Sequence, residues 1–256
     1  MDLIEVRNVS KSFGGLRAVS DLTFNLGRGK IKGIIGPNGA GKTTIFNLIS
    51  GILTIDSGEI FFKGTVLNRL KPYQIAYLGL SRTFQNLQIF DNMTVIENVM
   101  VGLHPRTHSE ILHAIFRLGR SRNEERYIFE KAYEALQSVN MESRAAEMVS
   151  GLPFGDQKLV EVARALVADP EVIMLDEPVS GLNTQEIERL DDLIRKINAQ
   201  GKTILLVEHN MRFVMNICEE VLVVNYGKMI AEGDPSQIVS NRDVINAYLG
   251  EELRIA

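Results

Sequence analysis

One stretch near the start of the chain has both the residue types and the spacing of a phosphate-binding loop. It follows the short apolar run 31–35, which only Lys32 and Gly33 interrupt, and it precedes a helical pattern that begins at Ile45. Its glycines allow consecutive backbone N–H groups to turn toward an anion, and the helix adds the positive end of its dipole. Lys42 is expected to reach the β- and γ-phosphates of a nucleotide, and the Thr43 hydroxyl to ligate Mg²⁺. The predicted phosphate cradle comprises Gly36, Pro37, Asn38, Gly39, Ala40, Gly41, Lys42, Thr43 and Thr44.

Two acidic residues later in the sequence are placed to complete a Mg²⁺–nucleotide site. Asp176 and Glu177 directly follow the apolar run 172–175, which reads as a buried strand. Asp176 is expected to bind Mg²⁺ directly or through water, and Glu177 to act as the base for an attacking water. Two acids after a strand are also common in plain surface turns. The presence of the phosphate loop favours the catalytic interpretation.

A histidine and a glutamine are candidates for the same site. His209 follows the apolar run 203–207, and a parallel sheet would bring the ends of these strands to one edge. We expect His209 to donate a hydrogen bond to the γ-phosphate. Gln85 lies where the α/β pattern gives way to a helical one, so it could contact the metal or the water and respond to movement of the helices. Only this position distinguishes Gln85 from an ordinary surface glutamine.

Composition excludes several classes of protein. The chain has 256 residues and a net charge of −4, which does not provide the broad basic field of a nucleic-acid binder. Its single cysteine, Cys218, excludes an internal disulfide and a multi-cysteine metal site, and its apolar neighbours predict a buried thiol. No apolar run approaches the ~18 residues of a membrane span, and the start shows no export signal.

The hydrophobic periodicity predicts an α/β protein with a helical insertion. The α/β pattern covers 1–90 and 156–235, the helical pattern covers 91–155, and a short helical tail covers 236–256. Expected strands are 3–6, 22–26, 31–35, 59–63, 172–175, 203–207, 221–224 and 229–231, and expected helices include 109–118, 123–139 and 157–168. Capping boxes at Thr94 and Asn183 predict two further helix starts.

Taken in order, these motifs resemble those of the ATPase subunits of ABC transporters. The resemblance covers essentially the whole sequence and adds three segments to the residues above: 152–156 with 163–166, Pro178 after the two acids, and 180–183. Four stretches, 82–86, 93–98, 207–211 and 247–250, most resemble the ATPase subunit of branched-chain amino acid importers.

The resemblance implies a fold, a cofactor and partners. The fold would be a P-loop NTPase (RecA-like) core with an antiparallel β subdomain and an α-helical ABC subdomain. Two ATPase subunits would form a head-to-tail dimer around two ATP molecules with Mg²⁺, at the cytoplasmic face of the membrane. They would be attached to two integral-membrane permeases, served by a periplasmic or extracellular solute-binding protein. Phe13 would stack on adenine, Gln85 would link to the permease, and Gly155 and Asp156 would face the ATP of the opposite subunit.

Two departures from the family pattern affect the expected site. Pro153 replaces the usual serine, so no side-chain hydroxyl is available there, although the Gly155 N–H and the following helix N-terminus could still bind phosphate. Asn183 replaces the aspartate of many relatives and keeps an acceptor without the charge.

Two alternatives of function remain at this stage. A related transporter could move urea, other amino acids or amides, or could export lipopolysaccharide. A soluble ABC ATPase acting on nucleic acid or ribosomes is more distant, because the sequence has one nucleotide core and no sustained heptads. Within the helical insertion, which would act as the lever to the permease, the apolar residues of 111–116 either pack internally or meet that permease.

Overall fold

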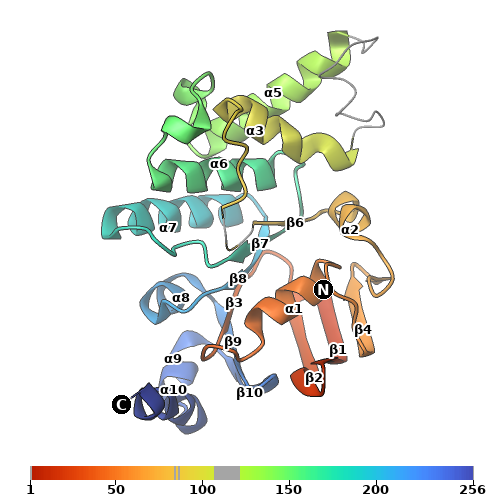
Figure 1. Ribbon diagram of the computed structural model, residues 1–256, viewed down its shortest axis with the longest axis vertical. Helices are drawn as coiled ribbons and strands as arrows, with labels where there is room; N and C mark the ends of the chain where they lie inside the picture. Colours follow the sequence, from red (N-terminus) through yellow and green to blue (C-terminus); the bar gives the residue numbers. More distant parts are fainter. Residues whose placement is uncertain (1, 84, 86, 107–121, 256) are drawn as a thin grey trace.

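Two β-sheets and the helices around them make up the structure (Figure 1). The computed structural model describes residues 2–83, 85, 87–106 and 122–255. The helix expected over 109–118, with the apolar residues of 111–116, therefore lies outside the described residues. Among the helices that are described, none has both the length and the apolarity to cross a bilayer.

The larger sheet has six strands in the order β10-β9-β3-β8-β7-β6. Only the β9–β10 pair is antiparallel. Every residue of β3, β7 and β8 is buried, which explains why these strands appear in the sequence as short, mostly apolar runs. The strands are β3 (Ile31–Ile35), β6 (Leu80–Arg82), β7 (Val172–Asp176), β8 (Thr203–Val207), β9 (Glu220–Asn225) and β10 (Lys228–Gly233).

The smaller sheet is antiparallel, in the order β2-β1-β4-β5. Its strands are β1 (Asp2–Phe13), β2 (Leu16–Gly27), β4 (Ser57–Phe62) and β5 (Thr65–Val66). The first two are much longer than the expected 3–6 and 22–26, because irregularities interrupt their alternation without ending the pairing. One occurs near Asn8, whose φ is +50°.

Twelve helical segments are present in the described residues. They are α1 (Lys42–Ile49), α2 (Pro72–Leu78), α3 (Val95–Met100), η1 (Val101–Arg106), α5 (Arg122–Ser138), η2 (Glu142–Arg144), η3 (Val149–Gly151), α6 (Phe154–Leu166), α7 (Thr184–Ala199), α8 (Met211–Ile217), α9 (Pro235–Ser240) and α10 (Arg242–Ile255). The capping box predicted at Thr94 is confirmed, because its backbone N–H donates to Glu97 Oε2 at 2.7 Å and its hydroxyl accepts from the Glu97 N–H at 3.4 Å. Figure 1 shows α3, α5 and α6 at one end of the molecule and α9 and α10 at the other.

The core forms two hydrophobic clusters, one on each face of the six-stranded sheet. Successive side chains of a strand point to opposite faces, so Leu206 of β8 joins the cluster with α3, α5 and α6, while Leu205 joins the cluster with α1 and the smaller sheet. The helical segment therefore shares its core with the sheet. The domain limits 1–90 with 156–235, 91–155 and 236–256 stay a prediction. Cys218 is buried as predicted, and burial raises the pKa of its thiol to about 12.

Candidate functional site

The phosphate loop connects β3 to α1, and two of its glycines have no room for a side chain. A Cβ on Gly36, whose φ is +155°, would overlap the carbonyl oxygen of Val224. A Cβ on Gly41, whose φ is +104°, would overlap the carbonyl oxygen of Ala18. The loop is thus pressed between β9 and β2. Only glycine fits at both positions.

Lys42 lies within this loop rather than extending into solvent. Its ammonium donates to the carbonyl oxygens of Gly36 at 2.6 Å and Pro37 at 3.0 Å, and the residue is 7% exposed. The N-cap residue of α1, Gly41, has no side chain with which to cap the helix, and the first turn contains no acid. A cation beside an uncapped helix N-terminus is an arrangement that attracts an anion. Thr43, the predicted Mg²⁺ ligand, is exposed at the start of the helix.

Asp176 ends β7 and is 1% exposed. Its Oδ2 accepts a hydrogen bond from Arg82 Nη2 at 2.7 Å, and its backbone N–H donates to Thr83 Oγ1 at 3.3 Å. Its Oδ1 is buried with no hydrogen-bond partner in the described residues. Burial raises the pKa of Asp176, and the adjacent Arg82 opposes that rise. A buried carboxylate with one unpartnered oxygen is suited to a cation.

The three residues predicted to be catalytic lie around one carboxylate. Gln85 Nε2 donates to Glu177 Oε2 at 3.1 Å, and His209 Nδ1 lies 3.8 Å from the same oxygen. The structure thus brings together residues from the ends of β6, β7 and β8. Glu177 has a φ of +48°, a conformation that costs about 1–3 kcal/mol for a residue other than glycine. Such strain gathers at functional sites and was not visible in the sequence.

Glu208 contributes to the site through its own carboxylate, a role that the sequence did not predict. It is 0% exposed, and its carboxylate accepts hydrogen bonds from the backbone N–H groups of Val179 at 2.9 Å, His209 at 3.0 Å and Asn210 at 3.2 Å. Burial raises the pKa of Glu208, and the three N–H groups oppose the rise. This side chain ties the loop after Glu177 to the loop that carries His209. The available signal was an acid directly after the apolar residues 204–207 of a buried strand.

The aromatic residue predicted to meet adenine lies at the end of the first hairpin. Phe13 is 44% exposed and pairs with Leu16 across the turn. Ala18, a little further along β2, contacts the phosphate loop as described above, so the hairpin end and the loop are neighbours. A second turn closes on the loop, since the Gly227 N–H donates to the Ala40 carbonyl at 2.9 Å.

The segment 152–156 forms the start of α6. Pro153 occupies the N-cap and makes no capping hydrogen bond through its side chain, so the first N–H groups of the helix are not bound by a cap. A Cβ on Gly155 would overlap the side chain of Glu186, so this glycine allows α6 and α7 to approach closely. The Asp156 carboxylate binds two guanidinium groups, Arg144 at 2.9 Å and Arg189 at 2.8 Å. Both of its oxygens therefore have partners within this chain, while contact of Gly155 and Asp156 with a second ATP stays a prediction.

Asn183 caps the helix α7 through its side chain. Its Oδ1 accepts from the Glu186 N–H at 3.0 Å, and its own N–H donates to Glu186 Oε2 at 2.9 Å. This is the capping box expected from the sequence at the start of α7. Asparagine and aspartate are about equally good helix N-caps.

Comparison with known proteins identifies the family. The model of the ABC transporter family matches residues 19–180, and a model of the branched-chain amino acid ATP-binding cassette transporter family matches 228–253. The chain is 40% identical over 250 residues to the high-affinity branched-chain amino acid transport ATP-binding protein LivG of Escherichia coli K12, covering 97% of this chain and 98% of that protein. It is 39% identical over 250 residues to BraF of Pseudomonas aeruginosa, with the same coverage.

Solved structures agree with the sequence relatives. The ADP conformation of an ATP-binding cassette of an ABC transporter superposes with a TM-score of 0.87 at 30% identity, covering 98% of this chain and 99% of that one. A bacterial ABC transporter cassette described as dimeric superposes with a TM-score of 0.74 at 26% identity, covering 91% and 98%. The P-loop NTPase fold with its ABC-type helices is thereby confirmed. The phosphate loop, the acids behind it and these relatives lead to one conclusion: the chain belongs to the ABC transporter family, as an ATP-binding subunit that hydrolyses ATP.

Proposed function

We propose that this chain powers the uptake of branched-chain amino acids through partner permeases. The observation that carries the proposal is the 40% identity, over 97% of this chain, to a branched-chain amino acid transport ATP-binding protein, and the meeting of Gln85 and His209 at the Glu177 carboxylate supplies the chemistry. The match of 228–253 to the model of branched-chain amino acid transporters supports this cargo over urea, other amides or lipopolysaccharide. A role on nucleic acid or ribosomes has no support in the described structure.

ATP binds at the loop between β3 and α1. Its phosphates accept hydrogen bonds from the loop N–H groups and from Lys42, whose ammonium exchanges the carbonyl oxygens of Gly36 and Pro37 for phosphate oxygens. Phe13, at the neighbouring hairpin end, stacks on adenine.

The residues present fit a Mg²⁺ ion. Mg²⁺ is usually held by one or two protein ligands together with substrate phosphates and water. The Thr43 hydroxyl, the unpartnered Oδ1 of Asp176 and Gln85 would hold it. When bound, the ion neutralises charge that develops on the phosphates.

Hydrolysis relies on the cluster at Glu177. Its carboxylate takes a proton from the water that attacks the γ-phosphorus, and the bond to the β-phosphate oxygen breaks to release ADP and phosphate. His209 donates a hydrogen bond to a γ-phosphate oxygen. Gln85 orients the carboxylate through its 3.1 Å hydrogen bond. Glu208 binds backbone N–H groups of both loops, the one after Glu177 and the one that carries His209, and so fixes their relative position.

Two ATPase subunits assemble head to tail in the proposed complex. A similar cassette is described as dimeric, which supports such an assembly. The uncapped N-terminus of α6, including the Gly155 N–H, then faces the γ-phosphate bound to the partner subunit. Phe154 lies against Gly181 of the same subunit. The start of α6, which would face the ATP of the partner subunit, therefore contacts the loop that follows Glu177, the base for this subunit's own ATP.

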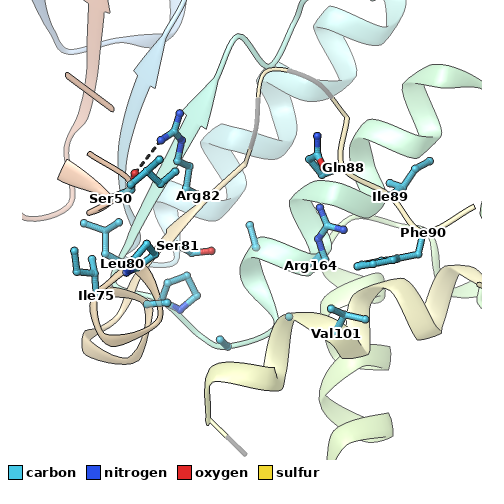
Figure 2. A pocket seen from close by; sticks show the side chains of 17 residues that line it. Ser50, Ile75, Leu80, Ser81, Arg82, Gln88, Ile89, Phe90, Val101 and Arg164 are labelled. Atoms are coloured by element: carbon cyan, nitrogen blue, oxygen red, sulfur yellow. Dashed lines mark hydrogen bonds between the residues drawn. The ribbon is translucent and has the colours of Figure 1, made fainter. Parts of the chain in front are cut away.

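The permease is proposed to dock in a groove between α2, β6 and α6 (Figure 2). The groove encloses about 730 Å³, and its walls include Ile75, Leu80, Ile89, Phe90 and Val101, with Arg82 and Arg164 as its charged residues. A short apolar segment that carries an acidic side chain would match this lining. Residues 88–90 come three to five positions after Gln85 in the sequence, so an occupant of the groove would contact the segment of chain that follows Gln85. The ATPase would thus lie at the cytoplasmic face of the membrane, with a solute-binding protein acting on the opposite side.

Purification from native membranes tests this assignment. The tagged protein should bring along two multi-span permeases and a sibling ATPase, identified by mass spectrometry. Ala76→Arg places a long charged side chain in the groove wall and should reduce permease recovery, whereas Val239→Arg, the same change at an exposed residue of α9, should not. Uptake of labelled leucine, compared with urea, then tests the cargo. Recovery of only soluble or nucleic-acid partners would contradict transport.

A further inference from the structure

Arg82 is a buried cation that neither the phosphate loop nor the cluster at Glu177 accounts for. It ends β6, the edge strand of the six-stranded sheet, and pairs with Met174 of β7. Its side chain is 7% exposed. Burial of an arginine is costly unless carboxylates or other acceptors surround the guanidinium. The contacts of the Arg82 guanidinium therefore indicate the role of this buried charge.

The guanidinium joins three elements. Nη2 donates to Asp176 Oδ2 at 2.7 Å, while Nη1 donates to Asn47 Oδ1 at 2.8 Å and to Ser50 Oγ at 2.8 Å. The same group lies 5.4 Å from the ring centre of Phe46. Asn47 and Phe46 belong to α1, the helix that starts at the phosphate loop, and Ser50 is its C-cap. Figure 2 shows the bond from Arg82 to Ser50 at the wall of the groove.

The contact with Asp176 has a consequence for the other oxygen of that carboxylate. Because Arg82 holds Oδ2, the carboxylate cannot rotate without breaking a charge-assisted bond, and the hydrogen bond from its backbone N–H to Thr83 fixes the main chain beneath it. Oδ1 is then the oxygen left for a cation. Groups that orient a metal ligand typically change metal affinity by about 10–100-fold when they are removed.

We propose that Arg82 is a positioning residue for Mg²⁺: it holds Asp176 to the α1 helix through Oδ2 and so leaves Oδ1 available as the ligand that would hold the ion. The inference rests on the proposed Mg²⁺–ATP site. A purely structural alternative is that Arg82 only fastens β6 to α1 through Asn47 and Ser50. If Arg82 positions Asp176, a substitution lowers the affinity for Mg²⁺. If Arg82 is only structural, a substitution lowers the unfolding temperature and leaves the Mg²⁺ affinity unchanged.

The test is the Mg²⁺ dependence of nucleotide binding by the intact protein, without turnover. Binding of a methylanthraniloyl-ATP is followed by fluorescence over a Mg²⁺ titration, and thermal unfolding is recorded for each variant. Arg82→Gln should raise the Mg²⁺ concentration at half-saturation about 10-fold, with Mg²⁺-free nucleotide binding unchanged. Arg82→Lys keeps the charge but cannot reach both Asp176 and α1 with a planar fork, so an intermediate rise is expected.

Two control variants separate positioning from structure. Arg164→Gln removes the other arginine of the same groove, which pairs with Glu161 at 3.8 Å and should leave the Mg²⁺ midpoint unchanged. Ser50→Ala removes one anchor on α1 and leaves the bond to Asp176, so it should lower the unfolding temperature without moving the midpoint.

An unchanged midpoint in folded Arg82→Gln would overturn the inference. If that variant does not fold, Arg82→Lys decides, and a midpoint equal to the parental one overturns it. Nucleotide binding by the parental protein that does not depend on Mg²⁺ would contradict the proposed Mg²⁺ site itself, which keeps the two failures distinct.

Discussion

Glu177 illustrates how individual residues of this protein are set up for chemistry. Its backbone lies in the left-handed region, its N–H donates to the Val207 carbonyl at 2.9 Å, and its carboxylate accepts from Gln85. The surrounding strands hold a conformation that the residue would not adopt alone. The carboxylate of this strained residue is the one that Gln85 and His209 approach.

Glu177→Gln should retain ATP binding and lose turnover. The amide is nearly the same size but cannot accept the proton from water, and general-base catalysis is typically worth ~10²–10⁴ in rate. Phosphate release in the assembled transporter and binding of the fluorescent nucleotide measure the two effects. Glu188→Gln, the same change on the surface of α7, is the matched control and should turn over normally. Parental turnover by Glu177→Gln would show that another group is the base.

At the scale of elements, close contacts hold together the loops and helices that follow the central strands. Glu208, after β8, binds the Val179 N–H beyond β7, and Cys218, at the C-cap of α8, packs toward Gly33 of β3. A Cβ at Gly33 would come within 2.9 Å of Cys218 Sγ. Only a residue without a side chain therefore allows the end of α8 to pack this closely against β3. This packing is what shields the thiol from water.

The buried thiol predicts a specific loss of stability at alkaline pH. Burial raises the pKa of Cys218 to about 12, whereas a thiol in the unfolded state ionises near ~8.5. Its contribution is therefore complete below pH ~8.5 and is lost as pH rises from there toward 12. At pH ~10 the free energy of unfolding is lower by about 2 kcal/mol, because this pH lies about 1.5 units above the unfolded-state pKa and each unit corresponds to ~1.4 kcal/mol.

Urea unfolding of the parental protein and of Cys218→Ala measures this loss. The alanine variant should be less stable at pH ~7.5 because of the cavity, and the difference should shrink by about 2 kcal/mol at pH ~10. A difference that stays constant with pH would show that the native thiol ionises normally.

At the scale of the whole molecule, the proposed dimer depends on the start of α6. No side chain caps the first turn of this helix, and the Asp156 carboxylate is occupied by Arg144 and Arg189. Backbone N–H groups are then the donors that remain for the phosphate of the partner subunit. Pro153 supplies a fixed φ at the N-cap but no hydroxyl.

Pro153→Ser should strengthen ATP-driven dimerisation. The added hydroxyl can donate to the γ-phosphate of the partner subunit, adding a charge-assisted hydrogen bond across the interface. Light scattering at a series of ATP concentrations, in the slow Glu177→Gln background, measures the dimer. Pro153→Ala removes the ring without adding a donor and is the control. Equal dimerisation of the serine and alanine variants would mean that the backbone N–H groups suffice.

Much of this protein follows from local sequence. The phosphate loop has a required spacing, and β3, β7 and β8 are mostly apolar because both faces of a parallel sheet are buried. Capping boxes at Thr94 and Asn183 satisfy the N–H groups of their own helices, so they too could be located without a structure. The prediction for His209 relied on a rule of the same kind, that parallel strands end at one edge, whereas the prediction for Gln85 relied on its position between the α/β pattern and the helical insertion.

Tertiary structure decided what depends on contacts between distant segments. The length of β1 and β2 came from pairing that continues past irregularities, the φ of Glu177 from the strands around it, and the burial of Glu208 from backbone N–H groups brought to it. Arg82 shows the distinction most clearly. Its side chain binds Asp176, 94 residues away in the sequence, so no local pattern could reveal the contact. Sequence alone determined which groups are present and in what order, while packing determined which atoms those groups leave available, because a buried polar atom is defined by its neighbours.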